Sequence, residues 1–240
     1  MPLPKISAPT YELVLPSSNK KIRYRPFLVR EEKILIMALE SEDTKQITEA
    51  IKTVIHNCVI TRGVKVDKMS TFDIEYLFLN VRGKSVGETV EVNVTCPDDG
   101  QTKVPVEIDI DSIKIQKNSK HTNIIKLDDN LSVQMNYPSL DQFIETNFET
   151  DSKNTQVDQS LNVIMSCIKQ VYNKEESWSA SDCTKKELKE FVESMNSKQF
   201  KDIEAFFETM PKLSHKIKIT NPNTKVESEV VIEGLASFFS

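Results

Sequence analysis

The sequence is poor in glycine and histidine, which build many nucleotide-binding loops and catalytic centres. No dinucleotide fingerprint and no phosphate-binding P-loop can be assembled from the five glycines. None of the three histidines lies in a recognised metal or nucleophile motif. The glycines are Gly63, Gly83, Gly87, Gly100 and Gly234, and the histidines are His56, His121 and His215. Nucleotide binding through those motifs is excluded, and we expect a protein that is not an enzyme and holds no cofactor or metal.

The sequence also lacks an excess of positive charge and any long apolar run. It has 31 lysines and arginines against 36 aspartates and glutamates, for a formal net charge of −5. Such a chain has no global positive field for nucleic acid. No segment approaches the roughly 20 apolar residues of a membrane span, and residues 1–6 lack the apolar stretch of a signal peptide. We therefore expect a cytoplasmic protein that binds no membrane.

Cysteine is scarce and scattered. Cys58 and Cys167 lie within apolar helical patterns, so reduced thiols are expected rather than a disulfide framework. His56 and Cys58 are separated by about 200° on a helix and would not share a metal. Cys96 stands in a turn that resembles half of a zinc knuckle, but a second cysteine is absent. Carboxylates are abundant, yet abundance does not make a catalytic pair, and we interpret them as solvated charges.

The first half of the chain has the pattern of a hairpin, three helices and a second hairpin. Alternating apolar residues predict the hairpins, and apolar residues at helical spacing predict the helices. Ser70 and Asp73 form a possible capping box for the third helix, which should end near Gly83. The predicted elements are a hairpin over 11–26, helices over 28–39, 47–58 and 70–83, and a hairpin over 90–110.

The second half shows the same order of predicted elements, with polar insertions. Residues 73–78 (Asp-Ile-Glu-Tyr-Leu-Phe) match 202–207 (Asp-Ile-Glu-Ala-Phe-Phe), and residues 92–97 match 217–222. We predict an α+β fold with small antiparallel sheets and a tandem duplication, although a generic order with a chance match would give the same pattern. The second half's predicted elements are a hairpin over 125–138, helices over 140–148, 161–172 and 188–195, and a last hairpin after 202–207. Thr184 and Glu187 form a possible capping box ahead of the helix over 188–195.

The repeat sets the predicted domain boundaries. The first α+β unit covers 1–113, and the second covers 122–240 with insertions near 149–160 and 175–184. Between them a basic run forms a linker over 114–121 and contains Lys114, Lys117, Lys120 and His121.

One basic cluster stands out near the N-terminus. Lys20, Lys21, Arg23, Arg25 and Arg30 alternate with apolar Ile22, Tyr24 and Phe27. The cluster could contact nucleic acid or a protein partner. However, strand periodicity places the basic residues on one face and the apolar residues on the other, so solvation alone also explains it.

The chain ends with two aromatic residues, Phe238 and Phe239, which should pack on its own core or insert into a partner. From chemistry alone, the candidate partner-binding residues are Tyr24, Arg25, Phe27, Arg30, Phe238 and Phe239.

Two sequence blocks carry a resemblance to a known family. The first contains Tyr11-Glu12-Leu13, Leu15-Pro16 and residues 24–33 (Tyr-Arg-Pro-Phe-Leu-Val-Arg-Glu-Glu-Lys). The second contains residues 72–79 (Phe-Asp-Ile-Glu-Tyr-Leu-Phe-Leu) and 81–88 (Val-Arg-Gly-Lys-Ser-Val-Gly-Glu). Together they resemble the baseplate hub assembly proteins of T-even-type bacteriophages, clearly over 9–110 and diffusely beyond.

This resemblance implies a late viral protein, made in the cytoplasm of the host bacterium, that helps to build the central hub of the tail baseplate. The implied partners are other phage baseplate hub proteins, and no catalytic residues are carried over. It leaves open an assembly chaperone that departs or a structural subunit retained in the virion. A nucleic-acid-binding regulator that uses the basic hairpin is a further alternative, which the net charge disfavours, and a hydrolase using scattered carboxylates is the weakest.

Overall fold

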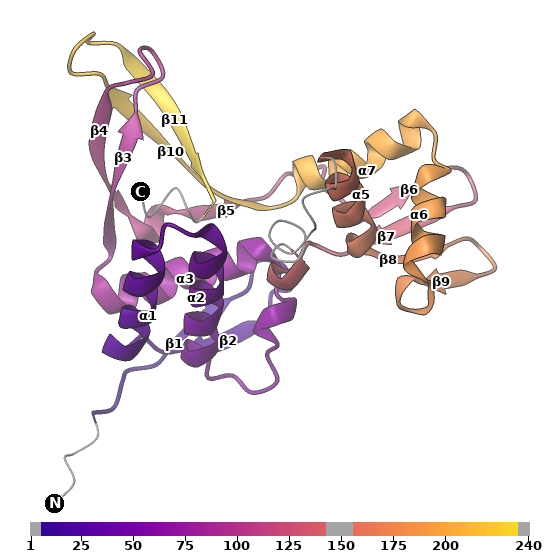
Figure 1. The fold of residues 1–240 in the computed structure, drawn as a ribbon, viewed down its shortest axis with the longest axis horizontal. Coiled ribbons are helices and arrows are strands. Elements are labelled where there is room, and N and C mark those ends of the chain that lie inside the picture. Colours follow the sequence, from indigo (N-terminus) through magenta and orange to yellow (C-terminus); the bar gives the residue numbers. More distant parts are fainter. Residues whose placement is uncertain (1–5, 143–155, 235–240) are drawn as a thin grey trace, which may run out of the picture. The chain divides into compact units, whose positions relative to one another are not determined.

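The fold is described by a computed structural model for residues 6–142 and 156–234 (Figure 1). Helices and small antiparallel sheets make up this part of the chain, which confirms the predicted α+β class. The chain forms two compact units. The first unit contains Met1–Val66, Phe72–Gln116 and Lys212–Ser240, and the second contains Asp67–Thr71 and Lys117–Pro211.

The helical part of the first unit follows the predicted order of a hairpin and three helices. The third helix is apolar on most sides and is correspondingly buried, with Phe72, Leu77, Leu79 and Val81 at most 2 % exposed. It continues past Gly83, where an added Cβ would contact the Ile110 side chain, to Val86. The elements are β1 (Tyr11–Val14), β2 (Lys21–Tyr24), α1 (Val29–Glu40), α2 (Thr44–Cys58), η1 (Val66–Lys68), which spans the boundary between the units, and α3 (Thr71–Val86).

Two long hairpins complete the first unit, and Figure 1 shows them side by side. Inward-facing residues alternate with exposed ones along β3, which is the pattern of a sheet with one packed face. The strands are β3 (Thr89–Thr95), β4 (Lys103–Asp109), β5 (Lys114–Gln116), β10 (Lys212–Thr220) and β11 (Glu227–Glu233), with η2 (Ile110–Ser112) between β4 and β5. β3 pairs with β4, and β10 pairs with both β11 and β5.

The second unit packs helices on one face of a four-stranded antiparallel sheet of order β6-β7-β8-β9. Its core includes Val133, Cys167 and Ile203, none of which has exposed surface. The elements are β6 (Ile124–Lys126), β7 (Ser132–Met135), α5 (Gln156–Cys167), β8 (Ile168–Tyr172), β9 (Ser177–Ser179), η3 (Ala180–Asp182), α6 (Lys185–Glu193) and α7 (Ser197–Thr209). The predicted capping box of Thr184 and Glu187 is confirmed at the start of α6.

One predicted helix is too long. The helical spacing over 161–172 holds only to Cys167, and residues 168–172 form strand β8. The reason is tertiary: Val133 of β7 pairs with Val171, so a ladder between strands replaces the last helical turn. The predicted helix over 140–148 lies outside the described residues beyond Gln142.

The compact units differ from the predicted domains mainly in where the last hairpin belongs. β10 and β11 belong to the first unit rather than to a second domain over 122–240, because β10 pairs with β5. The start of the predicted linker is itself strand β5, and the predicted insertion near 175–184 contains β9 and η3. Residues 156–160 of the other insertion are the first turns of α5.

Several local features recur between the two halves at corresponding positions. The backbone N–H of Leu28 donates to the side chain of Glu31, three residues on, over 2.8 Å. The backbone N–H of Ser139 likewise donates to Gln142 Oε1 over 2.8 Å. Arg25 N–H donates to the carbonyl of Cys58, and Asn136 N–H to that of Cys167. These recurrences favour the predicted duplication, which superposition of the halves tests.

Candidate partner-binding surfaces

The basic hairpin has the face segregation that strand periodicity predicts. In β2, Lys21 and Arg23 are exposed, whereas Ile22 and Tyr24 are 0 % and 2 % exposed. Lys21 forms a salt bridge with Glu12 of the paired strand. Tyr24 packs its ring against Tyr11, with 5.8 Å between ring centroids. Burial leaves Tyr24 almost no surface for a partner, so among these candidates it belongs to the core.

Arg25 and Arg30 both contact one buried carboxylate. Glu31 has no exposed surface and accepts hydrogen bonds from Arg25 Nη2 at 3.0 Å and Arg30 Nε at 2.7 Å. Burial raises the pKa of Glu31, but the hydrogen bonds from Arg25, the Leu28 N–H and Arg30 outweigh burial and lower the pKa to about 2. Arg25 is thereby occupied within the fold, while Arg30 keeps 71 % of its side chain exposed.

Phe27 is half-buried and sits where the two sequence blocks of the resemblance meet. Its backbone N–H donates to Ser85 Oγ over 2.9 Å. A second link ties the β1–β2 turn, which lies within the first block's span, to the second block: Ser17 N–H donates to buried Asp73 over 3.0 Å. The conspicuous residues Arg25, Glu31 and Asp73 therefore hold the hairpin, α1 and α3 together. Phe238 and Phe239 lie outside the described residues.

A surface that sequence reasoning missed lies on α1. Val29, Ile36, Met37 and Leu39 are 80 %, 50 %, 59 % and 43 % exposed. The sequence contained a signal for it, since this helix has apolar residues on more faces than a core contact requires. Exposed apolar residues gathered on one element are typical of a protein–protein contact.

The tips of the two long hairpins are joined by a buried amide. Asn221 has no exposed surface, and its Nδ2 lies 3.0 Å from both carboxylate oxygens of Asp98 and 2.9 Å from Asp99 Oδ2. Thr224 also donates to Asp98. Hydrogen bonds from Thr224 and Asn221 lower the pKa of Asp98. The amide thus donates hydrogen bonds to two carboxylates and links the hairpins to each other.

His121, predicted in the linker, belongs to an aromatic cluster of the second unit. Its Nδ1 lies 2.9 Å from Thr209 Oγ1, and its Nε2 lies 3.0 Å from the Tyr137 hydroxyl. Thr209 already donates its hydroxyl proton to the carbonyl of Ala205, so it accepts from Nδ1–H and Tyr137 donates to Nε2. Burial lowers the pKa of His121, in agreement with this neutral arrangement.

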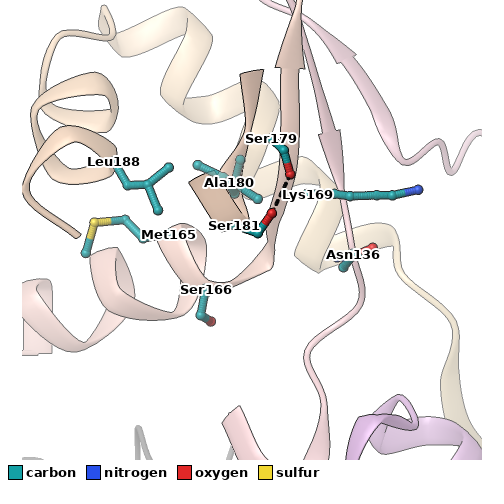
Figure 2. A pocket seen from close by; sticks show the side chains of 9 residues that line it. Asn136, Met165, Ser166, Lys169, Ser179, Ala180, Ser181 and Leu188 are labelled. Carbon is teal, nitrogen blue, oxygen red and sulfur yellow. Dashed lines mark hydrogen bonds between the residues drawn. The ribbon is translucent and has the colours of Figure 1, made fainter. Parts of the chain in front are cut away.

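A shallow pocket of about 450 Å³ opens in the second unit between α5, β8 and η3 (Figure 2). Ser179 and Ser181 share a hydrogen bond of 2.8 Å between their hydroxyls, and Figure 2 shows the Lys169 side chain extending away from Met165 and Leu188. The described lining brings together no base, nucleophile and orienting acid, so it gives no basis for a reaction.

Metal and membrane sites are equally unsupported over the described ranges 6–142 and 156–234. No group of three or more histidine, cysteine, aspartate or glutamate side chains there could hold a metal ion. Nor does any helix in these ranges have the length and apolar character needed to cross a membrane. The four cysteines are free, and burial raises the pKa of Cys58 and Cys167 to about 11.

The fold and these surfaces define an α+β protein of two units. Its conspicuous polar residues form contacts between helices and strands of the chain itself. The chain matches the family model for the T4 bacteriophage base plate protein over residues 8–240. It therefore belongs to this family of phage baseplate proteins. No curated protein and no solved structure matches the chain significantly.

Proposed function

We propose that this baseplate protein acts in building the central hub of the tail baseplate, through protein–protein interactions and without catalysis. The family match over residues 8–240 is the observation that carries the proposal. The hub is favoured by the resemblance over 9–110, whose two blocks are the segments that Ser85 and Asp73 connect. Its partners are other baseplate hub proteins, which it meets in the host cytoplasm during assembly.

Within this role we favour an assembly factor, or chaperone, over a structural subunit retained in the virion. Among the candidate residues Arg30 supplies exposed contact surface, whereas Tyr24 and Arg25 serve the fold. A nucleic-acid-binding regulator is a poorer interpretation, because Lys21 is paired with Glu12 and the net charge is −5.

The test combines affinity capture of the tagged chain from infected cells with quantitative mass spectrometry of purified virions. We expect hub proteins in the captured material and the chain itself to be missing from virions. Stoichiometric amounts in virions would establish the structural subunit instead. Capture of no tail protein, with absence from virions, would overturn the hub role.

A further inference from the structure

Helix α1 exposes an apolar stripe where a surface helix usually presents polar residues. The inward face of α1 is formed by residues outside this stripe, among them buried Glu31 and Ala38. The outward face carries Val29 and Ile36, seven residues apart on one side, with Met37 beside them. Figure 1 shows α1 at the margin of the helices of the first unit, next to α2. The stripe is therefore open to another molecule.

The apolar area continues beyond the helix itself. The bond from Phe27 N–H to Ser85 Oγ brings the end of α3 to the start of α1. Val86 follows Ser85 and is 62 % exposed. We call this area the α1 surface; it consists of Leu28, Val29, Ile36, Met37, Leu39 and Val86.

Two opposite charges flank the centre of the stripe at equal spacing. Lys33 lies three residues before Ile36, and Glu40 lies three residues after Met37. Both side chains are exposed, and within the described part of the chain neither forms an ion pair. Since Lys33 and Glu40 are seven residues apart, they point along the same side of α1.

A stripe with this arrangement is complementary to itself. When a second α1 lies antiparallel across it about a twofold axis, Ile36 meets Met37 of the other copy. Lys33 of each copy then faces Glu40 of the other, and the helix dipoles oppose each other favourably. A twofold interface requires this kind of self-match, in which one patch serves both partners.

We propose that the chain self-associates through the α1 surface, as a twofold dimer in which the two α1 helices pack antiparallel. The charge order selects a second copy over an unrelated partner, because each end of the stripe carries the charge that the opposite end needs. One helix with its neighbours makes a small interface, so the dimer should be weak and its population should depend on concentration. Self-association goes beyond the proposed hub role and does not depend on it.

Sedimentation velocity of the full chain across a concentration series tests the proposal. We expect a monomer–dimer equilibrium that Ile36→Lys abolishes. Lys33→Glu and Glu40→Lys should each weaken the dimer about tenfold, because each places like charges together twice in the interface. The double variant with both changes should restore it. Val231→Lys is the matched control, since Val231 is 45 % exposed on β11, a strand that Figure 1 shows apart from α1.

Circular dichroism and thermal unfolding confirm that each variant is folded before its association is compared. A monomer at every concentration would overturn the proposal, as would a dimer that Ile36→Lys leaves intact. If the chain stays monomeric while Ile36→Lys abolishes capture of another baseplate protein, the α1 surface serves that protein instead. That outcome overturns self-association and leaves the hub role standing.

Discussion

At the scale of single residues, Glu31 is the polar group on which the start of α1 most depends. Its carboxylate lies between two guanidinium groups and caps the backbone of Leu28. Removing one partner of a buried ion pair leaves the other without compensation, which costs more than the pair contributes in isolation. The neighbouring Glu32 is partly exposed and offers a matched control.

Glu31→Gln should lower the free energy of unfolding by about 1–3 kcal/mol at neutral pH, because Arg25 loses its counter-ion. Glu32→Gln should change it by less than about 0.5 kcal/mol. Urea unfolding of the two variants beside the parent chain measures this. Equal effects of the two substitutions would show that the Arg25–Glu31 contact does not hold α1.

The same contact predicts a pH dependence. The pKa of Glu31 is lowered from 4.5 to about 2 in the folded chain. The folded state therefore binds fewer protons than the unfolded state between these values, and the stabilisation present above pH 4.5 is lost as the pH falls toward 2. The difference between the parent chain and Glu31→Gln should shrink over that interval. A difference that stays constant from pH 6 to pH 3 would contradict the assignment.

His121 predicts a separate pH effect at higher pH. Its lowered pKa means that the folded second unit favours the neutral imidazole, so its stabilisation is complete above the ordinary pKa of 6.5 and is lost as the pH falls below it. Melting temperatures from pH 8 to pH 5 should fall more steeply for the parent chain than for His121→Gln. His56→Gln, at an exposed position of α2, is the control and should follow the parent.

Residue chemistry also shows where sequence reasoning succeeds. The alternation of Lys21, Ile22, Arg23 and Tyr24 was enough to separate a wet face from a packed face. It could not show that Arg25 turns inward, because its partner, Glu31, lies on the next element. For that reason the predicted partner-binding residues included both buried and exposed side chains.

At the scale of elements, the two long hairpins depend on the contact between their turns. Asn221 is the only described side chain that contacts both Asp98 and Asp99 across this junction. Asn221 aligns with buried Cys96 in the turn of the other hairpin. One turn therefore supplies the amide, and the other supplies the two carboxylates.

Asn221→Ala should lower the free energy of unfolding by about 1–3 kcal/mol, because two carboxylates would lose their shared donor. Asn93→Ala, at an exposed position of β3, should have little effect. Chemical denaturation gives the free energies, and hydrogen exchange locates the change. Unchanged protection of β3 and β10 in Asn221→Ala would contradict the role of this contact.

Element prediction failed where strand pairing overrides helical spacing. Ile164, Ile168 and Val171 fit one helical stripe, yet only Ile164 is helical. Ile168 and Val171 are β-branched and meet Met135 and Val133 of β7. A single sequence does not show that a neighbouring strand is available, so the periodicity of residues 161–172 supported either structure. Thr184 and Glu187, by contrast, form a local motif and were predicted correctly.

At the scale of the whole molecule, the order of elements was easier to predict than the grouping of elements into units. The hairpin of β10 and β11 ends the second half in sequence but packs with the first unit. Its partner strand β5 is three residues long and comes before most of the second unit in the sequence. So short a strand gives no sequence signal for the long-range pairing. If the chain arose by duplication, the last hairpin of the second half packs on the first unit rather than on its own half. Superposing the halves should then align β2 with β7 and α3 with α7.

The family assignment gives this architecture its biological setting, a phage tail baseplate. The most direct test of a role in building the hub is electron microscopy of particles from cells infected with phage that lack this protein. We expect tails and baseplates that fail at the central hub, with normal particles restored when the intact chain is supplied in trans. Complete, infectious particles formed without the protein would contradict the account.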